Sequence, residues 1–376
     1  MAINVTQSPA SNVSANDPIV WKFQFTALGT GTQVKRMIYY LADASNNKIG
    51  DDYVWTPAST SEVQPFDAMD VLRGLVSTIW PTVAGAAQTD SNCVKAVKVR
   101  YAEATFDTSN CSDTVSAYSD TATVNIWNTA LNIDNASALT FTGGKTGFLM
   151  NSYPDIMEWS PDSEPYVWFG GIGSVRLTWY NNSGTSLANT TINFTGASTA
   201  KYLCIDWRLY GLTTAPATLK LEVNDGTGYI TKWIKYSLCS CRDFYTCMNF
   251  LDPLGGRSSI SLLCQNEISI NREAKIVEVY NPTQTAGGTS VLNPKATETL
   301  KVQTVLDNTY EGLKYARALF GSPGYHIMRM SDSGTKTWYK FILTAGTTKV
   351  IEGKKDLLVE LSGYLAEEKS GQSFDI

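Results

Sequence analysis

The alternation of hydrophobic and polar positions is clearest in the C-terminal part of the chain. Residues after Lys295 alternate with a period of two, as a half-buried strand should, and apolar positions at helical spacing follow them. Gly321 and Pro323 then end this helix, because glycine accepts a left-handed cap and proline cannot continue the hydrogen-bond ladder. The predicted strands are Ala296–Leu306, Tyr325–Met330, Thr337–Leu343 and Lys355–Leu365. The pattern predicts a β-α-β-β-β module with a polar tail over residues 296–376.

The N-terminal part shows the same alternation, interrupted once. Pro18–Ala27 places aromatic residues on one face of a strand and polar residues on the other. Apolar residues spaced by three and four then predict a helix over residues 66–80. Further strands are predicted at Gln33–Ala42, Val94–Phe106 and Thr121–Trp127. We interpret residues 18–128 as an antiparallel β-sandwich with one covering helix, and residues 1–17 as an extended arm leading into it.

The middle of the chain contains short predicted strands about ten residues apart, separated by turn sequences rich in Asn, Gly and Ser. These strands are Ala138–Phe141, Gly147–Met150, Tyr166–Phe169, Val175–Tyr180, Thr190–Phe194, Tyr202–Asp206, Thr218–Val223 and Ile230–Leu238. Their regularity favours a second β-sandwich or barrel over residues 129–270. The weakly patterned segment 271–295 is interpreted as a linker or loop. The expected fold class is mainly β with a smaller α+β part: two consecutive antiparallel β-sandwich or barrel-like domains, then the C-terminal module.

Composition supports this picture and excludes some partners. Hydrophobic residues make up 43% of the chain and charged residues only 17%, a balance that favours sheets over helical bundles. The net charge of −5, without a cluster of Lys and Arg, gives no basis for sequence-specific binding of nucleic acid. No apolar run approaches the roughly 18 residues of a membrane-spanning helix, and the first residues do not resemble a signal peptide. We expect a soluble protein that is made in the cytoplasm and has no membrane partner.

The seven cysteines are expected to be free thiols, because their number is odd and no secretion signal accompanies them. A bridge between Cys93 and Cys111 across one hairpin is the alternative. The cysteines with the most suggestive spacing for a metal are Cys239, Cys241, Cys247 and Cys264. Zinc usually takes paired Cys-x2-Cys knuckles or histidines, which this spacing fits poorly. We therefore favour packed thiols over a metal site.

A catalytic centre is not expected. The one histidine, His326, lies on a predicted strand, and no Gly-x-Ser-x-Gly elbow accompanies it. Gly143-Gly144-Lys145-Thr146 is like the end of a phosphate-binding loop, but Leu139 stands where that loop needs a glycine. A glycine turn between two strands explains the segment better. We expect no catalytic residue, no cofactor and no enzymatic activity.

One loop combines aromatic residues with acids and is the candidate contact for a glycan or another partner. Its aromatic residues are Tyr153, Trp159, Tyr166 and Trp168, and its acids are Asp155, Glu158, Asp162 and Glu164. Aromatic faces beside acids can hold pyranose rings, and a pair of carboxylates could serve a glycoside hydrolase. The alternative is that the acids are solvated and the aromatic residues belong to a core.

Three blocks of sequence carry a resemblance to a known group of proteins. They are Ile3–Phe25 with Phe66–Trp80, Phe148–Asn151 with Tyr245–Leu262, and Glu298–Glu360. In this order they resemble segments of tail and neck structural proteins of tailed bacteriophages of Bacteroides-type hosts, including crAss-like phages. The resemblance spans most of the chain and contains no active-site motif. It implies a virion structural protein near the neck, tail ring, hub or baseplate.

The resemblance also implies the partners. A ring subunit would form a cyclic homo-oligomer, contact other tail or neck proteins, and line or surround a DNA channel. The protein would be made in the host cytoplasm and located in the virion. Residues 1–17 and 281–294 carry little apolar surface, so we expect them to become ordered only on assembly. A receptor- or glycan-binding tail module is the alternative function, and a glycoside hydrolase is a distant third.

Overall fold

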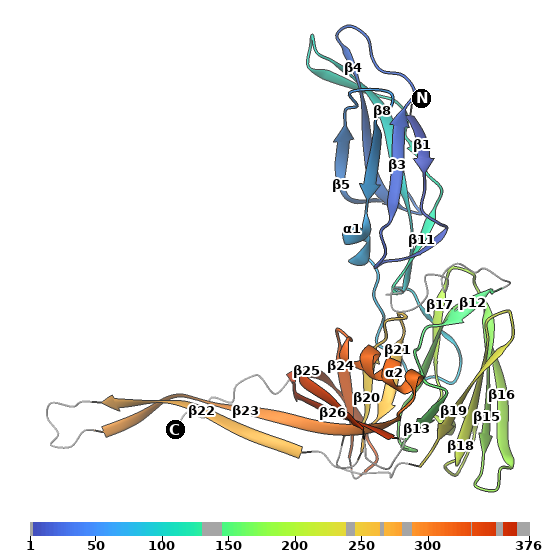
Figure 1. Ribbon diagram of the computed structural model, residues 1–376, viewed down its shortest axis with the longest axis vertical. Helices are drawn as coiled ribbons and strands as arrows, with labels where there is room; N and C mark the ends of the chain where they lie inside the picture. Colours follow the sequence, from blue (N-terminus) through green and yellow to red (C-terminus); the bar gives the residue numbers. More distant parts are fainter. Residues whose placement is uncertain are drawn as a thin grey trace.

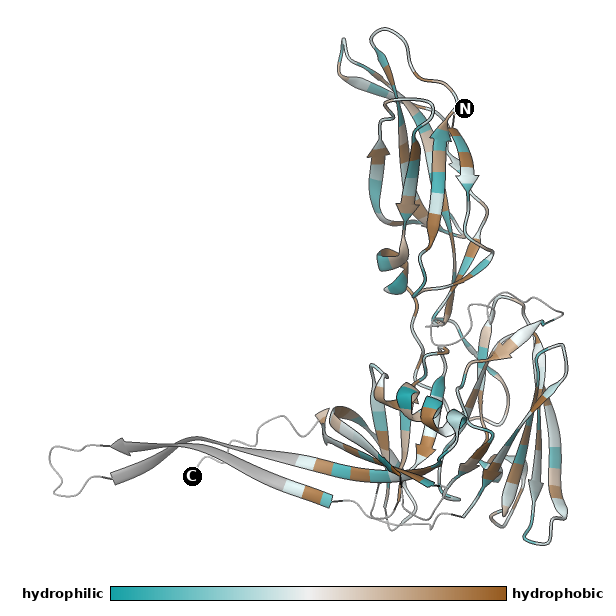
Figure 2. Ribbon diagram, in the orientation of Figure 1, coloured by the Kyte–Doolittle hydropathy of each residue, from teal (hydrophilic) through white to brown (hydrophobic). Residues whose placement is uncertain are grey.

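The chain folds into three β-rich parts, seen in a computed structural model (Figure 1). The structure describes residues 3–129, 145–237, 245–263, 267–279, 288–331, 333–350 and 356–366. Within these ranges it contains five β-sheets, two α-helices and a short 3-10 helix, which confirms the mainly β prediction. Hydrophobic and hydrophilic residues alternate along many strands (Figure 2), as is typical of sheets with one buried face.

The N-terminal part is a sandwich of two sheets around aromatic side chains. Its strands are β1 Ile3–Gln7, β2 Asn12–Ser14, β3 Val20–Phe25, β4 Gln33–Asp43, β5 Lys48–Trp55, β6 Val63–Asp67, β8 Val94–Asp107, β9 Ser112–Val115, β10 Ser119–Asp120 and β11 Val124–Trp127. One sheet has the order β1-β3-β6 and the other β2-β11-β8-β4-β5, with β9 and β10 also paired to β8. Trp21, Phe23 and Phe25 point inward from β3, and the Phe23 ring lies against Tyr39 and Tyr101.

The predicted N-terminal arm is wrong for the described residues 3–17. Strand β1 pairs with β3, and β2 pairs in parallel with β11. The side chains of Ile3 and Ala15 are buried in the sandwich core, so this segment has apolar surface enough to be part of the fold.

The predicted covering helix over residues 66–80 is also wrong in most of its length. Residues up to Asp67 form β6 beside β3, and helix α1 covers only Met69–Arg73. Phe66 lies opposite Trp21 in this sheet and is buried with it. Packing against distant aromatic rings therefore outweighs the local helical spacing at the start of the segment.

The middle part is a second sandwich. Its strands are β7 Gln88–Asp90, β12 Gly147–Leu149, β13 Ile156–Glu158, β14 Tyr166–Gly171, β15 Gly173–Tyr180, β16 Ser186–Phe194, β17 Ala200–Cys204, β18 Thr218–Asn224 and β19 Tyr229–Lys235, with the 3-10 helix η3 at Trp207–Tyr210. The sheets have the orders β12-β14-β17-β7 and β13-β19-β18-β15-β16. Strand β7 comes from the N-terminal part of the sequence and pairs with β17, so the two parts are joined by a shared sheet.

The C-terminal part is one sheet with a helix on it. Its elements are β20 Tyr245–Leu251, β21 Arg257–Ser261, β22 Glu267–Val279, β23 Gly288–Asp307, α2 Tyr310–Phe320, β24 Tyr325–Met330, β25 Lys336–Val350 and β26 Asp356–Leu365, and the sheet order is β21-β20-β24-β25-β26-β23-β22. The Thr309 hydroxyl accepts a hydrogen bond from the Gly312 amide and caps α2, as the sequence predicts. The side chain of Leu319 on this helix is buried, as its apolar spacing predicts. Strands β20 and β21, which the sequence placed in the middle domain, belong to the C-terminal sheet.

The predicted linker over residues 271–295 is wrong as well. Within the described residues of this range, the chain forms most of a long hairpin, with β22 paired to β23 from Glu267 opposite Lys301 to Val279 opposite Gly288. A two-stranded ribbon that reaches beyond a sheet is held by backbone hydrogen bonds and needs no apolar alternation. This explains why the sequence pattern there is weak.

Two of the three cores cross between the parts of the molecule. One core runs from the middle sandwich into the C-terminal sheet and includes Trp179, Phe250 and Val359. Another joins the N-terminal and middle parts around Trp127 and Trp168. At this second junction Gly255 has a φ of +96°, and a Cβ there would lie 1.8 Å from the Asn128 carbonyl oxygen. Only glycine allows so close an approach of two backbones.

Among the described residues, no helix has the length and apolar character needed to cross a lipid bilayer.

Candidate functional site

The first candidate surface is a projecting arm, which we define as the paired segments 270–279 of β22 and 288–298 of β23. Residues Leu300–Asp307 of β23 pair with β26 on the other side, but among the described residues segment 288–298 pairs with β22 alone. The two strands therefore leave the sheet together and extend well beyond it (Figure 1). Strand β22 has 13 residues, and at about 3.3 Å per residue it is roughly 40 Å long.

An arm of this kind is incomplete on its own. A two-stranded ribbon is at best marginally stable in water, and stable sheets need a third strand or a surface to pack on. The outer edges of the ribbon also present backbone N–H and C=O groups that can pair with another chain. The arm is therefore an element that gains stability from a partner.

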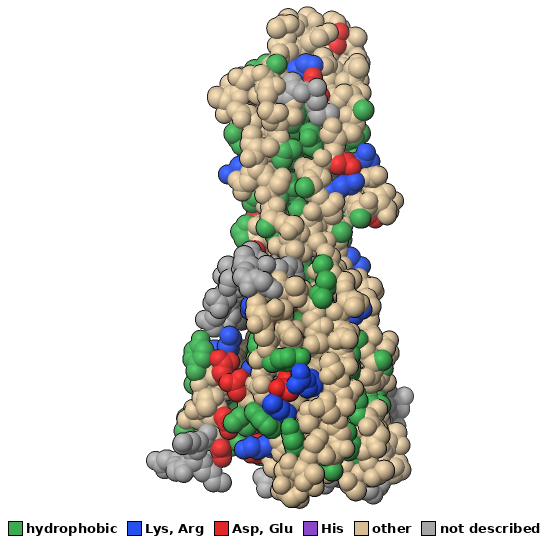
Figure 3. Space-filling view, turned by 90° about the vertical axis from the view of Figure 1, so that its right-hand side faces the viewer, with side chains coloured by type: hydrophobic (Ala, Val, Ile, Leu, Met, Phe, Trp, Pro, Cys, Tyr) green, Lys and Arg blue, Asp and Glu red, His purple; other side chains and the backbone are tan. Residues whose placement is uncertain are grey.

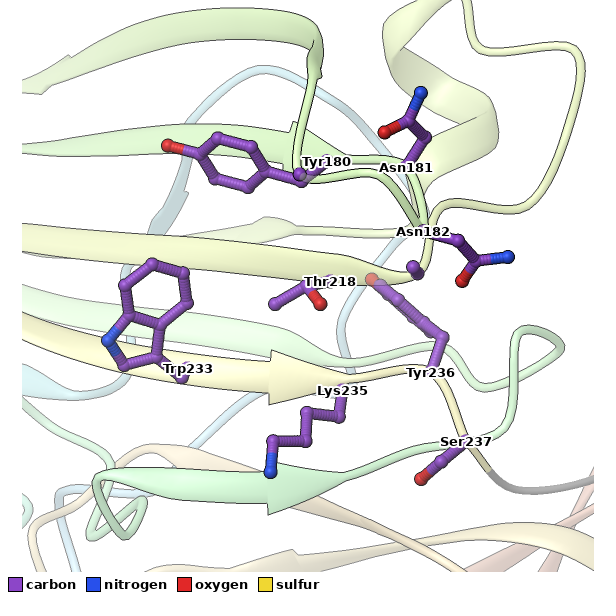
Figure 4. Close-up of a pocket in the computed structure, with 10 residues that line it drawn as sticks. Tyr180, Asn181, Asn182, Thr218, Trp233, Lys235, Tyr236 and Ser237 are labelled. Atoms are coloured by element: carbon purple, nitrogen blue, oxygen red, sulfur yellow. The ribbon is translucent and has the colours of Figure 1, made fainter.

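The second candidate surface is an open groove of about 670 Å³ at one end of the larger sheet of the middle sandwich (Figure 4). Its walls come from the end of β15 with the following turn, the start of β18 and the end of β19. The lining residues are Tyr180, Asn181, Asn182, Gly184, Ala217, Thr218, Trp233, Lys235, Tyr236 and Ser237. The close-up shows Tyr180 and Trp233 at one end, Asn182, Tyr236 and Ser237 at the other, and Thr218 and Lys235 between them.

Strand alternation brings the groove residues to the outer face. Along β19, Ile234 is fully buried whereas Trp233 is 37% exposed. The strand register places Lys220 opposite Trp233 and Thr218 opposite Lys235. The Tyr180 and Trp233 rings are 6.2 Å apart at an interplanar angle of 36°, and the Lys220 ammonium lies 5.8 Å from the Trp233 ring centre. The groove therefore has a preformed aromatic end.

The polar end of the groove is held by the turn after β15. The Asn181 side-chain oxygen accepts hydrogen bonds from the amides of Ser183 and Thr185, which fixes this turn. Within the described part of the chain, the Asn182 amide and the Lys235 ammonium have no hydrogen-bond partner. They are available to a ligand in the groove.

The aromatic residues predicted to hold a glycan are not on the surface. Tyr153, Trp159, Tyr166 and Trp168 are each no more than 1% exposed. The Tyr153 hydroxyl donates to the Tyr166 carbonyl, and the Trp168 indole N–H donates to Asp90. The glycan contact is therefore wrong for these residues, and the alternative of core aromatic residues holds. Tyr166 and Trp168 lie on β14, which has a strand on either side and is buried on both faces.

Three of the four acids of the same segment belong to ion pairs: Asp155 and Asp162 pair within the middle part, and Glu164 joins it to the C-terminal part. The Lys336 ammonium on β25 lies 3.0 Å from Glu164 and 3.2 Å from Asp206, and the Trp338 indole N–H donates to Glu164. Arg208 pairs with both Asp162 and Asp206. Burial works against the charge of Lys336, but Asp206 and Glu164 raise its pKa. Such a network is structural.

Of the four cysteines with the most suggestive spacing for a metal, Cys247 lies within the described residues. Cys247 is buried on β20, and burial raises its thiol pKa to about 12, which disfavours the thiolate that a metal needs. The described residues contain no group of His, Cys, Asp or Glu that could hold a metal ion. Cys239, Cys241 and Cys264 lie outside the described residues. The thiols of Cys93 and Cys111 are free, the first buried and the second exposed.

His326 lies on β24 of the C-terminal sheet, where Trp80 from the N-terminal part of the sequence packs against it. Its ring is 4.2 Å from that of Trp80, and its buried Nδ1 has no hydrogen-bond partner among the described residues. Burial, together with the nearby charges of Arg257 and Lys340, lowers the imidazole pKa to about 4. The ring is therefore neutral at pH 7.

The lowered pKa predicts a stability loss on acidification. Since unfolded histidine has a pKa near 6.5, the unfolded chain binds more protons between about pH 6.5 and pH 4, and stability falls as the pH is lowered through this window. We expect the free energy of unfolding, measured with urea, to drop by about 1–2 kcal/mol from pH 7 to pH 5 through this group. The variant His326→Gln should show a smaller difference in the free energy of unfolding between pH 7 and pH 5.

Two buried carboxyl groups act in the opposite sense, whereas carboxyl groups with a lowered pKa, such as Glu360, act in the same sense as His326. Burial raises the carboxyl pKa values of Asp90 and Asp252, so their contribution to stability grows as the pH falls. Comparison of the variant with the wild type at each pH isolates His326. An unchanged pH difference in His326→Gln would show that the ring is not the group responsible.

No protein-family model and no curated protein matches the sequence. A chain of the tail of an empty GTA particle is similar at 18% identity, over 32% of this chain and 90% of that one, with a TM-score of 0.22. CBD12 from CALX1.2 is similar at 10% identity, over 56% and 75% of the two chains, with a TM-score of 0.15.

A third similar structure is trypsin-activated alpha-2-macroglobulin from Escherichia coli, at 12% identity and a TM-score of 0.22. This chain is covered over 97% of its length but spans only 24% of that protein. The comparisons assign no family. TM-scores this low establish neither a shared fold nor a shared function.

Proposed function

We propose that this chain is a structural subunit of a bacteriophage virion, built into a ring or hub of the tail or neck, and that it acts by assembly and not by catalysis. The observation that carries the proposal is the arm of β22 and β23, which extends from the sheet without a third strand among the described residues. The resemblance of three sequence blocks to phage tail and neck proteins supports the same reading.

The arm also indicates the kind of contact. It projects from one side of the molecule (Figure 1). A contact between an arm and a different surface of the next copy is heterologous, and such contacts close into rings when the rotation between copies allows it. The proposed partners are further copies of this chain and neighbouring tail or neck proteins, and the proposed location is the virion.

Removal of the arm should abolish assembly but leave the fold intact. Ser269 and Thr299 are paired directly across the two strands, so residues 270–298 can be replaced by a two-residue Asn-Gly turn without a change of register. We expect the shortened protein to keep the circular dichroism spectrum and melting temperature of the full chain. In sedimentation velocity the full chain should form discrete oligomers with rising concentration, and the shortened chain should stay monomeric.

A matched control alters a different exposed hairpin turn and leaves its length unchanged. Replacement of Asn182-Ser183 in the turn between β15 and β16 by two glycines should leave assembly unchanged. A full chain that remains monomeric at all concentrations, and adds to no purified tail particle, would contradict the proposal. So would a shortened chain that assembles as well as the full one.

A further inference from the structure

We propose that the groove bounded by Tyr180, Trp233 and Lys235 is a saccharide-binding site, which takes a pyranose ring against the aromatic pair. The proposal is independent of the assembly role of the arm. It concerns a different sheet and different residues, and its test requires no oligomer. The aromatic residues that the sequence indicated for a glycan are buried, so this site is a new assignment to other side chains.

The aromatic end supplies the apolar contact. The faces of a pyranose ring carry C–H groups, and they pack against flat aromatic side chains that are held in place. Trp233 is 37% exposed on β19, which pairs with β13 and β18, and the Tyr180 ring lies 6.2 Å from it on the same side of the sheet. Both rings are visible at one end of the groove in Figure 4. Two neighbouring aromatic rings beside convergent polar groups are the lining expected of a ligand site.

The rest of the lining suits hydroxyl groups. Thr218, Asn182 and Ser237 offer hydroxyl and amide groups along the groove, and Lys235 contributes the one charged side chain among its lining residues. The lining contains a single small aliphatic residue, Ala217. A peptide partner would need deeper apolar pockets for its anchoring side chains, whereas a saccharide combines apolar ring faces with many hydroxyl groups. The chemistry of the groove therefore favours a saccharide over a peptide.

The charge of the groove limits which saccharides fit. No carboxylate belongs to its lining. The Lys235 ammonium lies on the same face as Trp233, and the Lys220 ammonium on this face pairs with Glu222 at 2.8 Å. Neutral and acidic sugars both fit such a site, and cationic amino sugars are disfavoured by repulsion. On the side of the molecule shown in Figure 3, hydrophobic side chains lie among charges of both signs over the lower half.

The experiment is a titration of the full chain, followed by tryptophan fluorescence and by isothermal calorimetry. The probes are gluco- and manno-oligosaccharides as neutral hexoses, chitohexaose as an N-acetylhexosamine, and oligogalacturonate as an acidic sugar. We expect binding of at least one probe, with a loss of at least about tenfold in affinity for Trp233→Ala and for Tyr180→Ala. A loss in Lys235→Ala for oligogalacturonate alone would identify the ligand as acidic.

The chain offers a matched control on the same strand. Tyr229 is also aromatic and is 45% exposed on the outer face of β19, with Arg176 over its ring, but it does not line the groove. Tyr229→Ala should bind the probes as the wild type does. Melting temperatures of all variants check that each is folded.

Three results would overturn the proposal. One is the absence of binding by any probe up to about 10 mM, where even contacts of ~3 kcal/mol would be detected. Another is equal loss of affinity in Tyr229→Ala and Trp233→Ala. The third is a loss of self-association in Trp233→Ala without any effect on saccharides, which would assign the groove to a contact between subunits.

Discussion

Trp168→Ala should destabilise the protein by about 3–5 kcal/mol, the range typical of a buried tryptophan replaced by alanine. Trp168 is fully buried in β14, and its ring stacks on Tyr202 at 4.8 Å. Its indole N–H donates to the Asp90 carboxylate across the junction of the N-terminal and middle parts. The substitution leaves a cavity and also removes a donor from a buried carboxylate, so both effects add. Urea unfolding at pH 7 measures the loss.

Two further variants separate the effect of the cavity from that of the lost hydrogen-bond donor. Trp168→Phe keeps an aromatic ring but not the donor, and should lie between alanine and the wild type. Trp233→Ala removes a tryptophan that is already partly exposed and should change the unfolding free energy little. Similar losses in Trp168→Ala and Trp233→Ala would contradict the assignment of one ring to a core and the other to a surface.

Lys336→Met should be the second most damaging change, with an expected cost of about 3–5 kcal/mol. Lys336 lies between Glu164 and Asp206, whose side chains are only 8% and 6% exposed. Removal of the cation leaves two nearly buried carboxylates with less compensation, and this costs more than the ion pair itself contributes. Because β25 and the middle sandwich meet at this lysine, thermal unfolding should also begin at a lower temperature.

A surface lysine on the same strand provides the control. Lys349 pairs with Glu360 at 2.8 Å, but its side chain is 64% exposed. Exposed ion pairs of this kind contribute little to stability, so Lys349→Met should be indistinguishable from the wild type in urea unfolding. A loss as large for Lys349→Met as for Lys336→Met would refute the distinction between the two pairs.

The local patterns predicted many of the described strands and the helix α2, because these depend on periodicity and caps that lie close together in the sequence. The inward alternation of β3 is an example. Helix α2 ends at Gly321 as predicted, but Gly321 has a φ of −82° and does not form the left-handed cap that was expected. The predicted strand Ala138–Phe141 lies outside the described residues. The segment 66–80 failed for the opposite reason. Its apolar spacing fits a helix, but Phe66 packs in a sheet against Trp21, a partner that no local window contains.

The candidate site was misplaced by the same kind of long-range effect. Tyr166 and Trp168 face one core of the molecule, whereas Val167 and Phe169 face another, so all four are buried. The continuous apolar run of β14 is the signal of such a central strand and could have excluded a glycan contact there. The sequence also indicated that the groove residue Trp233 faces outward. It shares its strand face with Tyr229, Thr231 and Lys235, which is the polar face.

The pairing of β7 with β17 has a consequence for synthesis on the ribosome. Asp90 emerges early, but its partner Ala200 is made about 110 residues later. At about 5–20 residues per second, the nascent chain waits roughly 5–20 s before this sheet can close. During that interval β7 has no partner strand, and its backbone N–H and C=O groups are satisfied by water alone.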